Sequence, residues 1–187
     1  MSQLEIKIGG FGGQGVILAG EIVGRAAAIF DGREATLTRS FGPEARGGAA
    51  SAQVIISTEK IYYPYVTRPE ILIVMSQEAH RRFSGELSPG GTLLIESDLV
   101  RVGEINPSQR LFGIPATRLA EELGRKIVLN MVMLGFFTAV TSVVGADSMR
   151  KAISESVPRG TADLNLRAFQ RGYDYGVDEM KKAGSSG

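Results

Sequence analysis

The feature that most constrains this chain is a glycine-rich segment at residues 9–15, Gly-Gly-Phe-Gly-Gly-Gln-Gly. It follows an alternating apolar run (Leu4, Ile6 and Ile8) and precedes a helical pattern, which predicts a strand, a tight loop and a helix. Glycines accept positive φ and let a ligand approach the main chain closely. The first amides of a helix lack internal partners, so this junction is suited to bind an anion.

The same segment has the spacing of dinucleotide-binding loops, because Gly10, Gly12 and Gly15 follow the pattern G-x-G-x-x-G. Nicotinamide enzymes with this loop also place an acidic residue at the carboxyl end of the second strand. Here the predicted second strand, residues 34–38, is followed by Arg39. No convincing proton-transfer group follows downstream. The sequence therefore predicts a phosphate-binding loop without dehydrogenase chemistry, and a tight turn that binds nothing stays open as the alternative.

Composition excludes several classes of function. The 21 basic and 20 acidic side chains give a net charge of +1, which argues against nucleic acid or an anionic membrane as a partner. The chain has no cysteine, which excludes disulfides, thiolate zinc sites and cysteine-ligated iron–sulfur clusters within it. Its single histidine, His80, lies in a polar patch and is expected to be an ordinary surface residue.

Residues 127–146 contain no charged side chain, a length that approaches that of a membrane span. Asn130 and two glycines interrupt this window, and no aromatic belt or basic cluster flanks it, so we expect a buried helix instead. The first residues lack the basic and apolar regions of an export signal. We therefore expect a cytoplasmic protein with no membrane partner.

Strand-like and helix-like patterns alternate along the chain and predict the α/β class. We expect a three-layer α/β/α Rossmann-like domain, with a mostly parallel sheet, one antiparallel hairpin and a helical C-terminal third. A single domain spans residues 1–180, and residues 181–187 are expected to form a frayed tail. The expected strands are residues 34–38, 70–75, 92–95 and 111–114, with a hairpin from residues 52–57 and 60–63.

Several motifs together resemble a known family. Residues 10–16, Gly-Phe-Gly-Gly-Gln-Gly-Val, and residues 42–48, Gly-Pro-Glu-Ala-Arg-Gly-Gly, look like the gamma subunit of the 2-oxoacid:ferredoxin oxidoreductases. Residues 130–135, Asn-Met-Val-Met-Leu-Gly, are also similar to that family, as is Asn165 with Ala168, Phe169 and Gly172. The resemblance extends from about residue 4 to about residue 178, and the second motif most resembles the 2-oxoglutarate branch, beside the pyruvate and ketoisovalerate branches.

The resemblance implies a subunit of an enzyme that oxidatively decarboxylates a 2-oxoacid, forms an acyl-coenzyme A and reduces ferredoxin. In that family, thiamine diphosphate lies between the alpha and beta subunits, and iron–sulfur clusters lie in the beta subunit or a ferredoxin-like delta subunit. The absence of cysteine in this chain agrees with that division. The gamma subunit is not expected to be catalytic alone, and it lies near the entrance for coenzyme A.

We therefore predict that the glycine loop approaches the phosphates of coenzyme A. Gln14 is expected to offer an amide contact, and Arg39 or Arg46 to offset phosphate charge. For Arg46, a surface turn or a contact with a partner subunit stays open, and Asn130 is expected to cap the apolar helix. No catalytic or metal-binding residue is predicted. The candidate binding residues are Gly10, Phe11, Gly12, Gly13, Gln14, Gly15, Arg39, Arg46, Gly47 and Gly48.

Two other functions stay open. One is a free-standing oxidoreductase that binds NADP or a flavin in the same loop, and the other is a purely structural assembly subunit. Tyr62, Tyr63 and Tyr65 form an aromatic cluster suited either to a protein interface or to half-buried packing. If it is an interface, the isolated chain is expected to associate with itself as a homo-oligomer.

Overall fold

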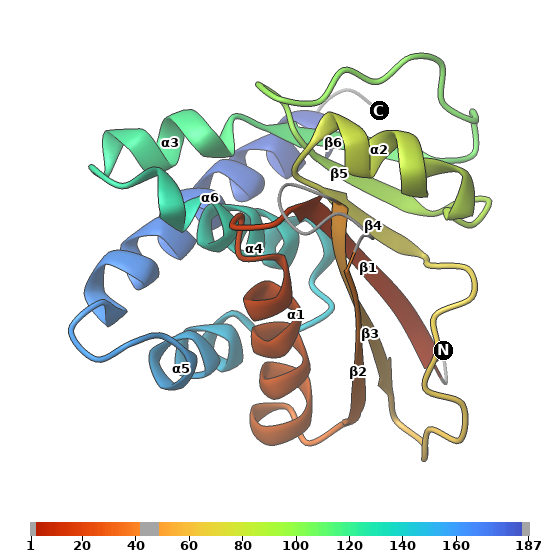
Figure 1. The fold of residues 1–187 in the computed structure, drawn as a ribbon, viewed down its shortest axis with the longest axis horizontal. Helices are drawn as coiled ribbons and strands as arrows, with labels where there is room; N and C mark the ends of the chain where they lie inside the picture. Colours follow the sequence, from red (N-terminus) through yellow and green to blue (C-terminus); the bar gives the residue numbers. More distant parts are fainter. Residues whose placement is uncertain (1–2, 42–48, 185–187) are drawn as a thin grey trace.

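A computed structural model of the chain describes residues 3–41 and 49–184. Its centre is a six-stranded sheet with the strand order β2-β3-β1-β4-β5-β6 (Figure 1). The strands β1, β4, β5 and β6 pair in parallel, whereas β3 is antiparallel to both β1 and β2. The strands are β1 (Gln3–Phe11), β2 (Glu34–Ser40), β3 (Ala49–Ser57), β4 (Ile71–Val74), β5 (Thr92–Glu96) and β6 (Arg110–Ile114).

The mostly parallel sheet and its one antiparallel hairpin are confirmed, but the hairpin lies elsewhere in the chain. It is formed by β2 and β3, whereas residues 60–63 form no strand. As a result, β3 lies between β2 and β1, so the end of β2 is not next to the glycine loop that follows β1. In the expected dinucleotide fold the second strand lies directly beside the first.

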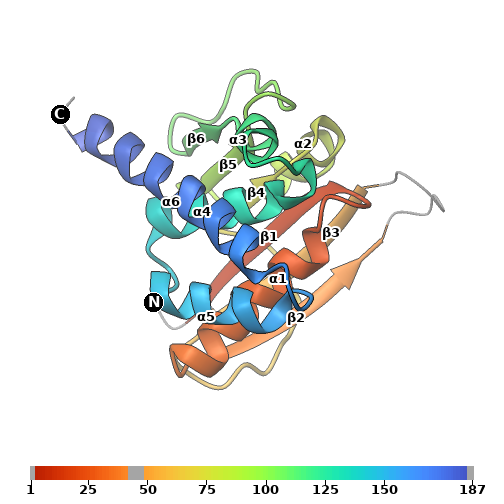
Figure 2. The ribbon, with the colours of Figure 1, turned by 90° about the vertical axis from the view of Figure 1, so that its left-hand side faces the viewer.

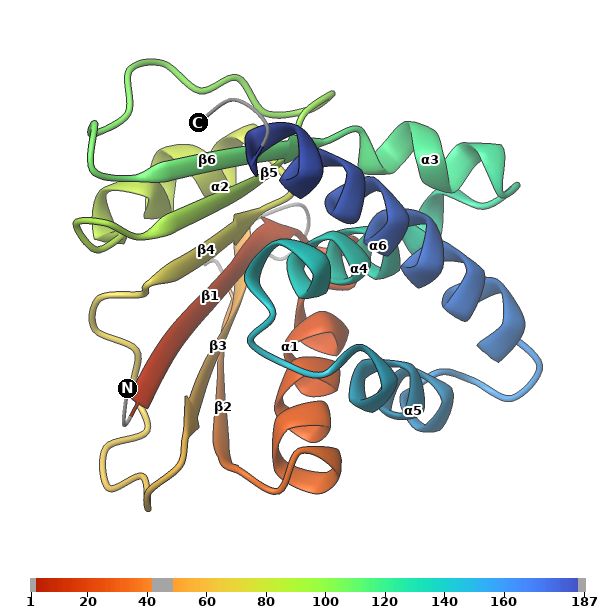
Figure 3. The same cartoon turned by 180° about the vertical axis from the view of Figure 1, so that it is seen from behind.

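Helices cover the sheet on both faces, so the three-layer prediction is confirmed. The helices α1, α3, α4, α5 and α6 lie on one face of the sheet, which is turned toward the viewer in Figure 2, and α2 lies on the other face; Figure 3 shows the molecule from the back of Figure 1. The apolar residues form a large core under the five helices and a smaller one under α2. The helices are α1 (Val16–Arg25), continued by a π-helical turn (Ala26–Phe30), α2 (Gln77–Phe83), α3 (Ala116–Glu122), α4 (Leu129–Thr141), α5 (Ala146–Ser156) and α6 (Ala162–Gly184), with 3-10 turns at Ser84–Glu86 and Lys126–Val128.

The uncharged window at residues 127–146 forms α4, a helix buried on nearly all sides. It crosses α6 where both helices carry a glycine. A β-carbon on Gly135 would overlap the main-chain oxygen of Phe169, and one on Gly172 would overlap that of Val132. Two helices can approach this closely only without side chains at the crossing. Among the described residues, no helix is long and apolar enough to cross a membrane.

One expectation for the end of a helix is wrong. Asn130 is the second residue of α4 and does not cap it, because Val128, the residue before the helix, holds the cap position without a side-chain hydrogen bond. The helix α6 extends to Gly184 and so includes residues 181–184 of the expected tail, and residues 185–187 lie outside the described residues.

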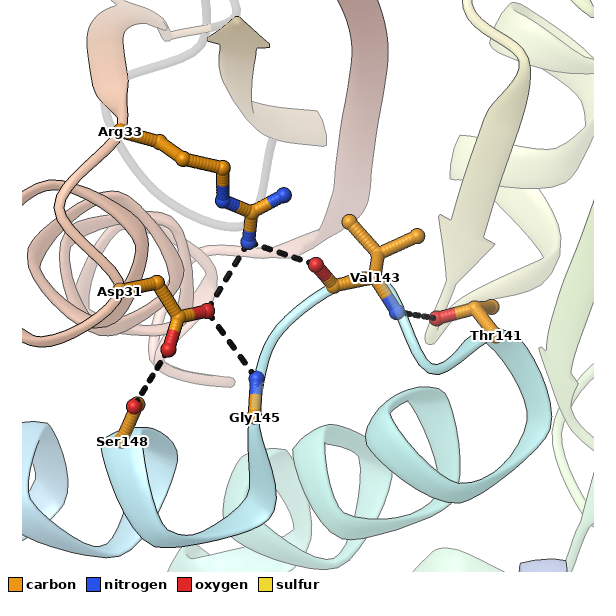
Figure 4. A network of polar contacts seen from close by, with 6 residues as sticks. All are labelled: Asp31, Arg33, Thr141, Val143, Gly145 and Ser148. Atoms are coloured by element: carbon orange, nitrogen blue, oxygen red, sulfur yellow. Dashed lines mark hydrogen bonds and ion pairs between the residues drawn. The ribbon is translucent and has the colours of Figure 1, made fainter. Parts of the chain in front are cut away.

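A network of polar contacts joins the end of the first helix to the start of α5 (Figure 4). The Asp31 carboxylate accepts hydrogen bonds from the Ser148 hydroxyl, the Gly145 amide (3.1 Å) and Arg33 (2.9 Å). Arg33 also donates to the main-chain oxygen of Val143. Because Gly145 precedes the first residue of α5, the negative charge lies at the positive end of that helix.

Candidate functional site: an open glycine loop beside an apolar cavity

The glycine loop connects β1 to α1, as the sequence predicts, and one of its side chains holds it in place. The Gln14 side-chain oxygen accepts a hydrogen bond from the Phe11 amide (2.7 Å), and its nitrogen donates to the main-chain oxygen of Met75 (2.9 Å). The Gln14 amide also donates to the Phe11 main-chain oxygen. Gln14 therefore points inward and organises the loop, which leaves it poorly placed for the predicted ligand contact.

Four glycines of the loop fall into two groups, according to the space around them. A β-carbon on Gly10 would lie 2.6 Å from the Gln14 side-chain oxygen, and one on Gly15 would overlap the Asn130 amide. At these positions glycine makes room for the protein itself. At Gly12 and Gly13, in contrast, a β-carbon would meet no atom within 4 Å.

The open part of the loop presents unpaired main-chain donors. The amides of Gly12, Gly13 and Gly15 donate to no other group among the described residues. Gly13 and Gly15 have positive φ angles of 94° and 71°. The helix α1 has no side-chain cap and no acidic residue in its first turn, so its positive end stays uncompensated. These amides can bind an anion.

A cavity of about 720 Å³ lies beside the loop. Residues from the first turns of α1, α4 and α6 line it, so three helices begin around one space. Most of its wall is nonetheless apolar, and Asn130, Thr161 and Asn165 add polar groups. Such a cavity suits a ligand that has both an anionic and an apolar part. The apolar lining comes from Phe11, Val16, Ile17, Leu18, Phe41, Ile127, Val128, Met131, Val157, Pro158 and Leu164.

The structure does not bring the predicted arginine Arg39 to this cavity. Arg39 lies opposite Ala52 on β3, which in turn lies opposite Ile8 on β1. Its guanidinium forms an ion pair with Glu21 and lines a separate groove between β2, α1 and α5. The insertion of β3 between β1 and β2 is the physical reason. Arg46, Gly47 and Gly48 lie outside the described residues.

A different arginine lies at the cavity. Arg125 is exposed on its wall and makes no ion pair with any residue that the structure describes. It follows Gly124, whose φ of 89° ends the turn after α3. Arg125 was not among the residues predicted from the sequence. A glycine and a basic residue are recognisable signs of the end of a helix, but they do not indicate a cavity beside it.

The cavity holds no group of side chains typical of acid–base or metal chemistry. His80 belongs to α2 on the opposite face of the sheet, where burial lowers its pKa. Within residues 3–41 and 49–184, no cluster of acidic residues or histidine could hold a metal ion. The described residues of the site are suited to bind and position a ligand.

The sequence matches the family model of pyruvate ferredoxin/flavodoxin oxidoreductase over residues 5–175, which is nearly the whole chain. The chain belongs to this family. A curated relative is the 2-oxoglutarate synthase subunit KorC of Methanocaldococcus jannaschii, which is 48% identical over 172 residues. That similarity covers 91% of this chain and 92% of the relative.

Solved structures agree with this family. The gamma subunit of a keto/oxoacid ferredoxin oxidoreductase from Geobacter sulfurreducens PCA has a TM-score of 0.83 and 39% identity, over 94% of this chain and 99% of that one. A 2-oxoglutarate:ferredoxin oxidoreductase from Magnetococcus marinus, with 2-oxoglutarate, coenzyme A and succinyl-CoA bound, has a TM-score of 0.86 and 25% identity. The match covers 94% of this chain but 31% of that one. The resemblance seen in the glycine loop is thereby confirmed.

Proposed function

We propose that this chain is the gamma-type subunit of a cytoplasmic 2-oxoacid:ferredoxin oxidoreductase whose substrate is 2-oxoglutarate. The complex decarboxylates the 2-oxoacid, transfers the acyl group to coenzyme A and passes the electrons to ferredoxin. Two relatives support this substrate, since KorC and the Magnetococcus enzyme are both named for 2-oxoglutarate. The iron–sulfur clusters belong to the partner subunits, because this chain contains no cysteine to ligate them. We assign thiamine diphosphate to the partner subunits as well, as the family resemblance implies.

Within that complex, this chain contributes the binding of coenzyme A. The observation that carries this proposal is the set of unpaired amides at Gly12, Gly13 and Gly15, which faces a cavity where three helices begin. The phosphates of coenzyme A require such donors, and the apolar wall accommodates the rest of the molecule. Arg125 supplies positive charge at the cavity wall, and Arg46, from the second family motif at residues 42–48, is a second candidate.

Gly12→Ala tests this proposal without straining the main chain, because Gly12 has no positive φ and a methyl group meets no protein atom there. In the assembled complex we expect the methyl group to obstruct the phosphates and to weaken coenzyme A binding about tenfold, a loss of about 1.4 kcal/mol. The Michaelis constant for 2-oxoglutarate should stay unchanged. Equilibrium titration and initial rates measure both quantities, and Arg125→Ala provides a second variant that is expected to weaken binding of coenzyme A.

Gly24→Ala is the matched control, since Gly24 lies on α1 away from the cavity and also has free space around it. It should bind coenzyme A as the unchanged complex does. If Gly12→Ala also binds coenzyme A normally, the loop only packs against a partner and the chain is an assembly subunit. Activity of the isolated chain with NADP or a flavin would instead support a free-standing oxidoreductase.

A further inference from the structure

One polar side chain in the cavity wall has an unused hydrogen-bonding group. Asn165 lies in the first turn of α6 and is 7% exposed. Its amide nitrogen donates to the main-chain oxygen of Thr161 at 2.8 Å. Its amide oxygen accepts no hydrogen bond from any described residue, and it is not among the unbonded atoms that are fully enclosed by protein. The oxygen therefore remains accessible within the cavity that Asn165 lines.

The orientation of this amide is fixed by chemistry. A main-chain oxygen can only accept a hydrogen bond, so the atom of Asn165 that faces Thr161 must be the nitrogen. The oxygen, which can only accept, is then left on the other side. Asn130 in the same wall differs, because its nitrogen donates to the Gly15 oxygen (3.3 Å) and its oxygen accepts from the Met131 amide (3.0 Å). Both ends of the Asn130 amide are thus used within the protein.

The surroundings of Asn165 indicate what its free oxygen binds. The same wall includes Val157, Leu164 and Met131, which offer no hydrogen-bond donor from their side chains. A nearly buried acceptor in such a place calls for a donor from whatever fills the cavity. A phosphate lacks such a donor at neutral pH and would be repelled by the oxygen. The partner is therefore an uncharged group that donates a hydrogen bond, either an N–H or an O–H.

We propose that the Asn165 amide oxygen accepts a hydrogen bond from an N–H or O–H group on the uncharged part of the bound ligand. This inference rests on the proposed function, in which the ligand is coenzyme A. Coenzyme A has such donors in two parts: the adenosine, with its amino group and a ribose hydroxyl, and the pantetheine arm, with its amides and a hydroxyl. The glycine loop thus binds the anionic part of the ligand, and Asn165 selects the part that enters the apolar cavity.

Asn165→Ala in the assembled complex tests this assignment. Binding is measured with coenzyme A, with adenosine 3′,5′-bisphosphate and with pantetheine, the last two as inhibition constants against coenzyme A. We expect coenzyme A and one of the two fragments to bind about tenfold more weakly, the amount typical of one lost hydrogen bond. The other fragment should bind unchanged. A loss for the bisphosphate places the donor on the adenosine part, and a loss for pantetheine places it on the pantetheine arm.

Gln170→Ala is the matched control, because Gln170 is an amide residue on the same helix that does not line the cavity and is bonded to Arg150 and Asp174. It should bind all three molecules normally. Unchanged binding in Asn165→Ala overturns the assignment, as does an equal loss for both fragments with a lower melting temperature, which would reveal a structural role only. The result with Gly12→Ala is separate: if that variant weakens coenzyme A binding and Asn165→Ala does not, this inference fails while the proposed function stands.

Discussion

At the scale of single residues, the glycines at positions 10, 12, 13 and 15 of the loop have two different causes. Gly10 and Gly15 make room for Gln14 and Asn130, whereas Gly12 and Gly13 leave open space. The sequence pattern G-x-G-x-x-G cannot separate these causes, because glycine is required for both. It also cannot show that Gln14 is used internally, since its acceptor, Met75, follows β4 and is 61 positions away in the chain. Only the fold brings the two residues together.

Asp31 provides a prediction about stability at this scale. Burial raises the pKa of Asp31, but the hydrogen bonds from Ser148, Gly145 and Arg33 outweigh it, and the pKa lies below its usual value. An asparagine at this position has no negative charge and only one accepting oxygen, so it cannot replace the carboxylate as the acceptor of all three hydrogen bonds. We expect Asp31→Asn to lower the free energy of unfolding at pH 7 by about 1–2 kcal/mol, measured by urea denaturation of the chain.

The dependence on pH follows from the same shift. Because the folded-state pKa is lower than the unfolded value of about 3.9, the ionised carboxylate stabilises the fold above that value. This stabilisation is lost as the pH falls through the folded-state pKa, so the difference from Asp31→Asn should shrink below about pH 4. Asp147→Asn, at a side chain that is 89% exposed, should change stability by less than about 0.5 kcal/mol. A difference that stayed constant down to pH 2 would contradict this explanation.

At the scale of helices and strands, periodicity predicted most elements but not their neighbours. The apolar runs at residues 70–75 and 92–95 form β4 and β5, because a short continuous apolar run is typical of a parallel strand that is covered by helices on both faces. Residues 60–63 also have the composition of a strand, yet they find no partner. The placement of Arg39 failed for a related reason, because pairing between β1 and β3 is a long-range contact that no local pattern records.

The crossing of α4 and α6 provides a second prediction about stability. Gly172→Ala would force a methyl group against the main-chain oxygen of Val132, and neither helix can yield locally. We expect the free energy of unfolding to fall by about 3 kcal/mol, the upper end of the usual cost of overpacking. Thermal and urea unfolding measure the change.

Gly24→Ala again serves as the control, since a methyl group on α1 meets no atom. It should leave the stability unchanged or raise it by up to about 1 kcal/mol, because alanine favours a helix more than glycine does. If Gly172→Ala were as stable as Gly24→Ala, the two helices would not be held as closely as the structure indicates.

At the scale of the whole molecule, one surface segment remains unexplained by the fold. Tyr62, Tyr63 and Tyr65 follow β3 and are 86%, 60% and 56% exposed, so the half-buried role left open by the sequence does not apply. Clustered, exposed tyrosines are typical of protein interfaces. A subunit of a larger complex requires such a surface, and this segment is a suitable candidate for contact with the partner subunits.

Replacing these three tyrosines with serine tests the interface. We expect the variant to keep its melting temperature, because the side chains support no core, but to lose most co-purification with the partner subunits. Leu111→Ser, at an apolar side chain that is 38% exposed on β6, is the control and should co-purify normally. Full recovery of the complex with the triple variant would place the interface on another surface.

The glycine crossing of α4 and α6 has a consequence for how a ligand enters. Two walls of the cavity, at residues 128–131 and 161–165, lie at the starts of α4 and α6, and these helices are in close main-chain contact farther along, at Gly135 and Gly172. This contact couples the two walls, so we expect them to move together and not to open independently. Under the proposed function, coenzyme A would therefore enter and leave on the side formed by the β1–α1 junction.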